Sequence, residues 1–486
     1  MRAPILLISP LICAAAGYGQ SGIVRNAATA GVRFTGPTVL APDSRAVISY
    51  SRTESAPPHV SATVSLRPAG AATAIPAQVL IADGSTINFI VPSTAPIGPA
   101  QLIYQATGDT TKWIEVAVAP SAFQLFINPT TDAPIAQFAP ATGSARPLAL
   151  ATPVQPGQAA VIWGSGAPMT TSIPAITLGG VPQQVLFAGN PVQMLGIEQI
   201  NFRVAPNTPL GCYVPLTVSW GADTFTSFLS TSTDGTACQH PFRLSAKDLA
   251  TLDSGGSVNV ATVTFSSNFT AAAADHDSRQ EQISANFIGW SGSFLASRFN
   301  ATAAAGCTVS TPAASLISLV VPGFPSNLIG DITLRQGSSQ VVLSAANNFT
   351  QELPAISSGP WTLSTRASTL NFTITPPVML SAATTPVPLS RATDQTISWN
   401  GSDLDPNSGA ILNLTSPNQP TLTCNAPAAA GSVVIPKELL TRIAPGAATL
   451  RLLISQPIEN SPNVLNGDSV VVVSQTSTDT RPVVLQ

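Results

Sequence analysis

The chain has 486 residues, of which 44% are hydrophobic and only 9% are charged, and its formal net charge is -3. At roughly 100 to 150 residues per domain this length predicts three to five domains, and the hydrophobic content excludes disorder caused by a lack of core residues. The charged fraction is far below the roughly 25% of an average soluble protein, and Lys and Arg form no cluster. This pattern excludes nucleic-acid binding and attraction to an anionic membrane surface, both of which need several basic contacts.

The first twenty residues, MRAPILLISPLICAAAGYGQ, have the layout of a secretory signal peptide. Arg2 precedes an apolar stretch, Ile5 to Ala16, and small residues follow it. Cleavage is expected either at Ala14 to Ala16 or at Gly17 to Gly19. We therefore expect residues 1–19 to be removed and the protein to be secreted, in an extracellular or periplasmic location.

Two other interpretations of this segment are weaker. The apolar run is shorter than the ~20 residues of a membrane span, which argues against a permanent membrane anchor. No later segment approaches that length, so the protein is expected to have no membrane span after cleavage. Cys13 could suggest a lipoprotein, but Ile12 and Pro10 occupy positions where a lipobox needs a small and an aliphatic residue.

Short runs rich in Val, Ile, Thr, Phe and Leu, bounded by Pro, Gly, Asn and Asp, predict β-strands along the whole chain. The 44 prolines argue against long helices. The fold class expected from this pattern is all-β. The predicted strands include Arg45 to Tyr50, Ile87 to Val91, Gln101 to Tyr104, Ala159 to Trp163, Gln199 to Val204, Val214 to Trp220, Val258 to Phe265, Gln340 to Leu343 and Ser469 to Ser474.

Only two short helices are predicted. Ser245 to Leu252 begins with Ser245 and has Asp248 three residues later, which is the spacing of a capping box. Pro436 to Ile443 places a proline at the helix start and is followed by a Pro-Gly pair that would end it.

An internal repeat is the most informative feature. The sequence PDSRAVISY from Pro42 lines up with PGQAAVIWG 114 residues later, and INFIVPSTAPIGPAQLIY from Ile87 lines up with INFRVAPNTPLGCYVPLTV 113 residues later. Between them PAQVL at Pro76 matches PQQVL at Pro182, 106 residues on. A repeat of this length is a whole β-sandwich domain, so two sandwiches in tandem are expected.

The second copy carries a family resemblance. The stretch from Pro156 to Ser230, with PGQAAVIWGSG, ITLGGVPQQVLFAG and IEQINFRVAPNTPLG, resembles an uncharacterised domain of secreted acidobacterial (Solibacter-type) proteins. TLTCNAPAAAGSVVIPKELLTRI near the C-terminus is similar to a segment that recurs in the same proteins. The resemblance implies immunoglobulin-like modules of the IPT or TIG kind and no assigned activity. The first copy departs from the pattern at SRTESAPPHV.

These observations together predict the domain organisation. After a signal peptide at 1–19 we expect immunoglobulin-like sandwiches at 20–125 and 126–238. Two further β-rich modules are expected at 239–377 and 378–486, because Pro376-Pro377 is the clearest linker signal.

Four cysteines remain once Cys13 is removed, and an oxidising compartment allows three pairings of them. Cys212 and Cys238 bracket the last hairpin of the second sandwich, and we expect a disulfide there. Cys307 and Cys424 form a second disulfide across the last two modules or remain two buried thiols.

No catalytic set can be recognised. A nucleophilic hydrolase needs Ser or Cys beside a base, but the three histidines, His59, His240 and His276, lie in no such motif. Asp275, His276 and Asp277 with Glu281 form the densest ionisable cluster, which a hydrolase or a cation site could use, but a solvated loop is the favoured interpretation.

Asp403, Asp405 and Asn407 resemble the start of a calcium-binding loop, because oxygen ligands fall at alternate residues. Ser408 and Leu414 stand where an EF-hand needs Gly and Glu, so the alternative is a plain turn between strands. Calcium is thus a weak candidate, and no other cofactor is expected.

Glycan binding uses exposed aromatic rings, and six tryptophans are available. Trp163 and Trp220 end predicted strands and are expected to pack on the core. Trp290, flanked by Gly289 and Ser291-Gly292, is the candidate for stacking on a sugar.

The function expected from the sequence is that of a non-enzymatic secreted or cell-envelope protein that acts through β-sandwich surfaces in adhesion, scaffolding or matrix contact. The alternative is an extracellular glycan-binding protein, and a polysaccharide-active hydrolase is the third hypothesis. The expected partner is an extracellular protein or a glycan.

Overall fold

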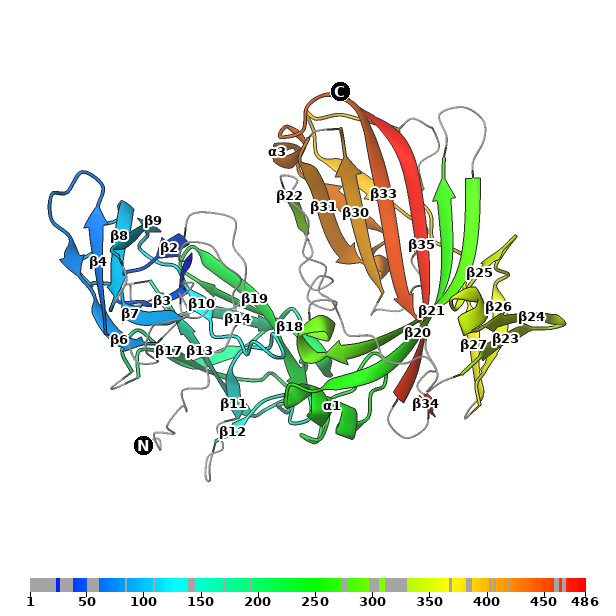
Figure 1. Cartoon of the computed structure of the whole chain (residues 1–486), viewed down its shortest axis with the longest axis horizontal. Helices are drawn as coiled ribbons and strands as arrows, with labels where there is room; N and C mark the ends of the chain where they lie inside the picture. Colours follow the sequence, from blue (N-terminus) through cyan, green and yellow to red (C-terminus); the bar gives the residue numbers. More distant parts are fainter. Residues whose placement is uncertain are drawn as a thin grey trace. The chain divides into compact units, whose positions relative to one another are not determined.

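The computed structural model describes residues 23–26, 38–49, 61–83, 85–107, 110–138, 145–168, 172–191, 194–271, 278–296, 306–310, 330–366, 369–381, 387–401, 404, 408–417, 419–458, 463–465 and 469–486. It divides into two compact units, residues 1–238 and 239–486. The described residues are mostly β-strand (Figure 1), which confirms the all-β fold class. No described helix is long and apolar enough to cross a membrane.

The first sandwich of unit 1 packs two sheets face to face around a core that includes Ile48, Phe89 and Leu102. One sheet has the order β1-β3-β7-β6 and the other β2-β9-β8-β4-β5, which is the strand arrangement of an immunoglobulin-like sandwich. β2 runs parallel to β9, and the other pairs are antiparallel. The strands are β1 (Ile23–Asn26), β2 (Thr38–Leu40), β3 (Arg45–Ser49), β4 (Ala62–Pro68), β5 (Ile75–Pro76), β6 (Gln78–Ala82), β7 (Thr86–Ile90), β8 (Gly98–Ala106) and β9 (Lys112–Val118).

The second sandwich repeats this design around a core that includes Ile162, Phe202 and Leu216. Its sheets have the orders β12-β11-β13-β17-β16, with β10 also on β13, and β15-β14-β18-β19. The strands are β10 (Gln124–Leu125), β11 (Ala136–Phe138), β12 (Arg146–Pro147), β13 (Ala159–Ser165), β14 (Ala175–Leu178), β15 (Val181–Pro182), β16 (Gln184–Gly189), β17 (Glu198–Arg203), β18 (Gly211–Trp220) and β19 (Asp223–Thr231).

The internal repeat corresponds to equivalent strands in the two sandwiches. β3, β7 and β8 in the first copy take the places of β13, β17 and β18 in the second. The PAQVL and PQQVL segments each carry a β-bulge at the same point, between Val79 and Ile81 and between Val185 and Phe187. A shared bulge shows that the repeat preserves local backbone geometry as well as hydrophobic pattern.

Unit 2 is built on a sheet of ten strands with a four-stranded sheet packed against part of it. The long sheet has the order β22-β31-β30-β33-β35-β20-β21-β25, and β28 and β34 also pair with β35. Its strands are β20 (Ser257–Thr270), β21 (Ser278–Ser291), β22 (Gly306–Ser310), β25 (Thr350–Leu353), β28 (Val387–Leu389), β30 (Gly409–Thr415), β31 (Thr421–Pro427), β33 (Gly446–Pro457), β34 (Asn463–Leu465) and β35 (Ser469–Leu485).

The remaining strands complete two cores in unit 2. The four-stranded sheet β24-β23-β26-β27 covers a core around Phe265 and Trp361, and the pair β29 and β32 covers a core around Trp399 and Leu412. These strands are β23 (Ile332–Gln336), β24 (Ser339–Leu343), β26 (Gly359–Ser364), β27 (Thr369–Ile374), β29 (Gln395–Ser398) and β32 (Ser432–Ile435).

Strand β35 belongs to both of the modules that were expected to be separated at 377/378. Its first half contributes Val471 and Val473 to the core of the third region, and its last residues, Val483 and Leu485, belong to the core of the fourth. Thr375 N donates to Gln475 Oε1 over 3.1 Å, on the N-terminal side of the expected Pro376-Pro377 linker. The two regions therefore share one strand and cannot be separated by a cut at this point.

Both predicted helices are present. In α1 (Ala246–Asp253) Ser245 is the N-cap, its Oγ accepts from Asp248 N, and Asp248 Oδ2 accepts from Ser245 N, so the capping box is complete. The helix buries Leu249 and Leu252. The second helix, α3 (Lys437–Leu440), is a single turn after Pro436.

Candidate functional site

Trp290 is buried, which corrects the prediction that it stacks on a sugar. Only 1% of the residue is exposed, and its ring lies 5.0 Å from that of Phe242 and 6.0 Å from that of Phe294. Trp290 shares its face of β21 with polar residues such as Ser284, but the chain that follows Cys238 returns to cover it. The ring is therefore a packing element of unit 2.

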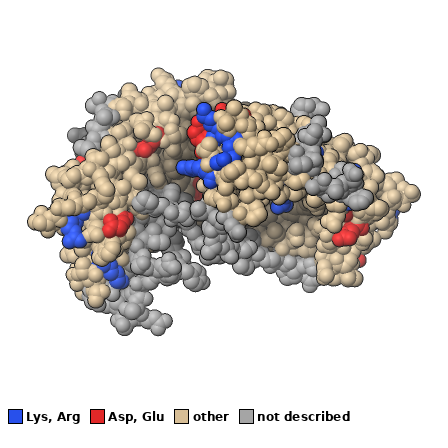
Figure 2. Space-filling view, turned by 90° about the horizontal axis from the view of Figure 1, so that it is seen from above, with Lys and Arg blue, Asp and Glu red and all other residues tan. Residues whose placement is uncertain are grey.

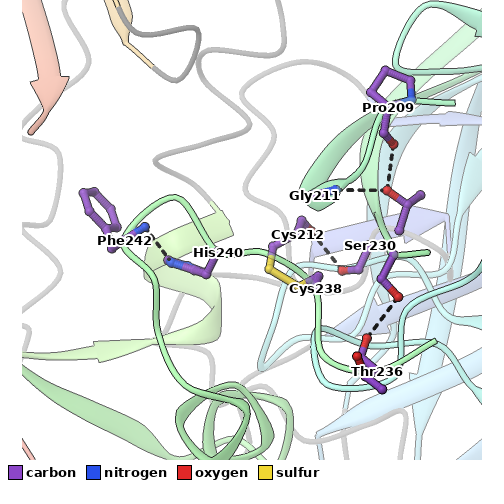
Figure 3. Close-up of a disulfide and its surroundings, with 10 residues drawn as sticks. Pro209, Gly211, Cys212, Ser230, Thr236, Cys238, His240 and Phe242 are labelled. Carbon is purple, nitrogen blue, oxygen red and sulfur yellow. Dashed lines mark hydrogen bonds between the residues drawn. A yellow bond between two sulfur atoms is a disulfide. The ribbon is translucent and has the colours of Figure 1, made fainter. Parts of the chain in front are cut away.

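The Cys212–Cys238 disulfide expected from the sequence is present and closes a loop of 26 residues (Figure 3). Cys212 lies near the start of β18, and Cys238 N donates to Leu150 O over 3.0 Å. Ser230 Oγ also donates to Cys212 O over 2.9 Å. The bridge thus anchors the chain end of unit 1 to its second sandwich, and by loop entropy it contributes about 3.5 kcal/mol.

Of the two alternatives for Cys307 and Cys424, the structure has the disulfide. The two cysteines lie directly opposite each other on the antiparallel strands β22 and β31. The closed loop spans 117 residues. Strand β22 is therefore covalently held at the edge of the long sheet.

Several predicted residues lie outside the described part of the chain. These are the calcium candidates Asp403, Asp405 and Asn407, together with His59, Asp275, His276, Asp277 and the signal peptide. The calcium site thus remains a prediction. Among the residues that the structure does describe, no group of three or more His, Cys, Asp or Glu could hold a metal ion.

Glu281, the fourth member of the ionisable cluster, lies near the start of β21 and is 2% exposed. Its Oε1 is bonded to Arg279 and accepts from Ser267 Oγ over 3.3 Å. The carboxylate is thus enclosed in the sheet and held by a cation, and it offers no open face to a substrate.

Among the described carboxyl groups, that of Glu198 on β17 has the pKa that is shifted furthest from its usual value. Burial raises its pKa to about 7, although the backbone N–H groups of Gly166 and Ala167 bind the carboxylate and act in the opposite direction. It lies opposite Gly164 in the register of β13 and β17. These contacts are with the backbone and place no base or nucleophile beside the carboxyl group. We therefore interpret Glu198 as a structural residue at one end of the second sandwich.

His240 is the histidine in the described part of the chain, and it is buried, with 4% of the residue exposed. Phe242 N donates to His240 Nδ1 over 3.1 Å, and the two rings lie 5.8 Å apart. Burial lowers the pKa of His240 to about 3. The imidazole is therefore neutral at physiological pH, and its role is structural.

This burial makes the stability of the protein sensitive to acid. Below about pH 6.5 the unfolded chain protonates His240 while the folded chain does not, so the free energy of unfolding falls as the pH falls from 6.5 toward 3. We expect this residue alone to lower it by about 2 kcal/mol between pH 7 and pH 5. Urea unfolding at both pH values should show a smaller difference for His240→Asn, which keeps an acceptor but does not titrate. If the free energy of unfolding changed between pH 7 and pH 5 by the same amount in the wild type and in His240→Asn, this assignment would be contradicted.

One exposed aromatic residue, Trp113 on β9, was not singled out from the sequence. It is 59% exposed, whereas Trp220, Trp290, Trp361 and Trp399 are buried. Ile114, Val116 and Val118 on the same strand face the core. The signal was present in the sequence KWIEVAV, because Trp113 alternates with these residues and shares the face of Glu115.

Trp113 lies on an open sheet face, formed by the outward side chains of β4, β8 and β9. One row across these strands places Trp113 opposite Ile103 and Ile103 opposite Ser65. The next row is a hydrogen-bonded ladder in which Arg67 donates to Gln101 Oε1 and Gln101 Nε2 donates to Glu115 Oε1 over 2.9 Å. We call these six residues the Trp113 face.

The charge on the Trp113 face is balanced, because the ladder begins with a guanidinium and ends with a carboxylate. Sparse charge is a general feature of the protein, and the view in Figure 2 shows few acidic or basic side chains among many uncharged ones. The face therefore combines an exposed indole with paired hydrogen-bonding groups, and it has no excess of positive or negative charge.

Comparisons with known proteins do not place the chain in a family. No family model and no curated protein matches it. The resemblance to the acidobacterial family thus remains a proposal.

Solved structures with a similar arrangement are distant. A glucan-utilisation surface protein of Bacteroides ovatus, solved with a mixed-linkage heptasaccharide, is 13% identical over 40% of this chain and 44% of its own, with a TM-score of 0.22. This chain thus spans less than half of that protein. The I9–I11 tandem of titin is 7% identical over 69% of this chain and 94% of its own, with a TM-score of 0.14.

A Ca²⁺-stabilised adhesin from an Antarctic bacterium that binds ice is 11% identical over 97% of this chain and all of its own, with a TM-score of 0.14. Likenesses at this level carry no argument about function.

Proposed function

We propose that this protein is a secreted or cell-envelope binding protein that works through the surfaces of its β-sandwiches in adhesion, scaffolding or matrix contact. The observation that carries the proposal is the Trp113 face, an exposed aromatic residue on an open sheet of a disulfide-containing tandem of sandwiches. Large exposed aromatic side chains contribute strongly to binding when a partner removes them from water.

Two further features support an extracellular setting. The disulfides Cys212–Cys238 and Cys307–Cys424 persist in an oxidising compartment, and the expected signal peptide would direct the chain there. The burial of His240 and Glu281 supports a non-enzymatic function, because it removes two of the residues that a hydrolase would have used.

The test is saturable binding without turnover. Fluorescently labelled mature chain, incubated with intact bacterial cells and with extracellular matrix preparations, is expected to bind at a limited number of sites and to be displaced by unlabelled chain. The experiment is run with calcium and with EDTA, because a requirement for calcium would assign a site to Asp403, Asp405 and Asn407. Failure to bind either preparation, or release of soluble products by catalytic amounts of the chain, would contradict the proposal.

A further inference from the structure

We propose that the Trp113 face binds an uncharged polysaccharide, with one sugar ring stacked on the indole of Trp113. This inference rests on the proposed function and specifies its ligand. Among the described residues, Trp113 combines an aromatic ring, high exposure and a neighbouring row of hydrogen-bonded polar side chains.

The first step concerns the indole itself. An indole that is 59% exposed leaves a large apolar surface in water, and the face of the ring carries partial negative charge. The C–H groups on one side of a pyranose ring are apolar and slightly positive, so stacking removes both surfaces from water and is electrostatically favourable. Ile103 lies opposite Trp113 in the same row on the neighbouring strand and adds an apolar side chain to this face.

The second step concerns the hydrogen-bonding groups beside the indole. Trp113 and Glu115 are two residues apart on β9, so their side chains leave the same face about 7 Å apart. That distance is comparable with the length of one sugar residue. A sugar ring stacked on Trp113 would therefore bring the hydroxyl groups of the next sugar in the polymer to the Arg67–Gln101–Glu115 ladder.

The third step selects the chemistry of the ligand. A sugar hydroxyl both donates and accepts hydrogen bonds, and the ladder offers guanidinium donors at one end and carboxylate acceptors at the other. An acidic polysaccharide along the ladder would be attracted by Arg67 and repelled by Glu115 and so gains no net attraction, whereas an uncharged one is repelled by neither group. The balanced charge of the ladder therefore favours an uncharged polymer over an anionic one.

The fourth step concerns the shape of the face. The outward residues of β4, β8 and β9 form successive rows across three paired strands. An extended polymer can lie across two rows and contact the indole and the ladder together. A free monosaccharide would contact only one of them.

The test measures retardation of the full mature chain in native gels that contain one polysaccharide. The probes are hydroxyethylcellulose, galactomannan and dextran, which are uncharged, and polygalacturonate, which is acidic. We expect at least one uncharged polymer to retard the wild type and Trp113→Ala to weaken that binding by about tenfold or more, as for a central aromatic contact. Gln101→Ala should weaken it by a smaller factor.

The controls separate stacking from misfolding. Trp113→Phe should recover part of the affinity, and Ile173→Ala, which removes a 74% exposed side chain from the second sandwich, should bind like the wild type. Trp113 is the most exposed of the six tryptophans. The polymer that binds should therefore also protect the tryptophan fluorescence of the wild type from quenching by acrylamide. That protection should be lost in Trp113→Ala.

Three outcomes would overturn the inference: no retardation by any uncharged polymer, unchanged binding of Trp113→Ala, or tighter binding to polygalacturonate than to every uncharged probe. Binding to cells is then measured with the same variants. If cells retain the wild type while no polymer does, the ligand assignment is wrong and the proposed function stands. If the chain binds neither cells, nor matrix preparations, nor polymers, both proposals fail.

Discussion

Replacing Cys307 and Cys424 together by alanine is expected to lower the free energy of unfolding by about 5 kcal/mol. The disulfide closes a loop of 117 residues, so breaking it restores a large chain entropy to the unfolded state. It also holds β22 against β31 at the edge of the long sheet. Hydrogen exchange should therefore increase first in these two strands, and urea unfolding gives the total loss.

The matched control is the Cys212→Ala and Cys238→Ala double variant. Its loop has 26 residues, so the expected loss is smaller, about 3.5 kcal/mol. Exchange in β22 and β31 should stay at the wild-type rate in this control. Equal losses in both double variants would show that loop length does not govern the contribution of these disulfides.

Asp479→Ala is expected to destabilise the protein by about 3 to 5 kcal/mol, because it leaves Arg481 without its counter-charge. Asp479 is fully buried, the Arg481 side chain is 10% exposed, and their closest N and O atoms are 2.9 Å apart. The pair also binds Leu380: Leu380 N donates to Asp479 over 2.8 Å, and Arg481 donates to Leu380 O over 2.9 Å. It thus fixes the start of the fourth region to β35.

A double variant distinguishes a buried charge from an ordinary contact. Asp479→Leu combined with Arg481→Met removes both charges and keeps much of the volume, so it should cost less than Asp479→Ala alone. Urea unfolding of the two variants and the wild type measures the difference. A double variant that is less stable than Asp479→Ala would contradict the charge explanation.

These covalent and ionic links bear on the proposed function. A binding protein that acts outside the cell cannot rely on chaperones to restore it, and long β-sheets form through contacts between residues far apart in sequence. The disulfides close such loops and reduce the entropy of the unfolded chain. We interpret them as the elements that keep the sandwich surfaces ordered.

Several features were determined by the sequence alone, because they depend on neighbours along the chain. Alternation of apolar and polar residues predicted β18, in which Val214, Leu216 and Val218 are buried in turn. Ser245 and Asp248 predicted the capping box of α1. The repeat predicted two equivalent sandwiches, since copies of one pattern form the same strands.

Only the tertiary structure decided which face of a strand is covered. Trp290 shares a face of β21 with polar residues but is buried by Phe242 and Phe294, whereas Trp113 shares a face of β9 with Glu115 and remains exposed. Alternation assigns residues to two faces, but the segment that packs on each face comes from elsewhere in the chain.

The same distinction explains β35 and its buried ion pair. The sequence near Ser469 predicts a strand, but nothing local indicates that it extends to Leu485 and serves two cores. Asp479 and Arg481 look like surface residues in the sequence, because charged side chains are rarely buried unless they are paired. Their pairing with each other and with Leu380 arises only when β35 packs against a segment 99 residues earlier.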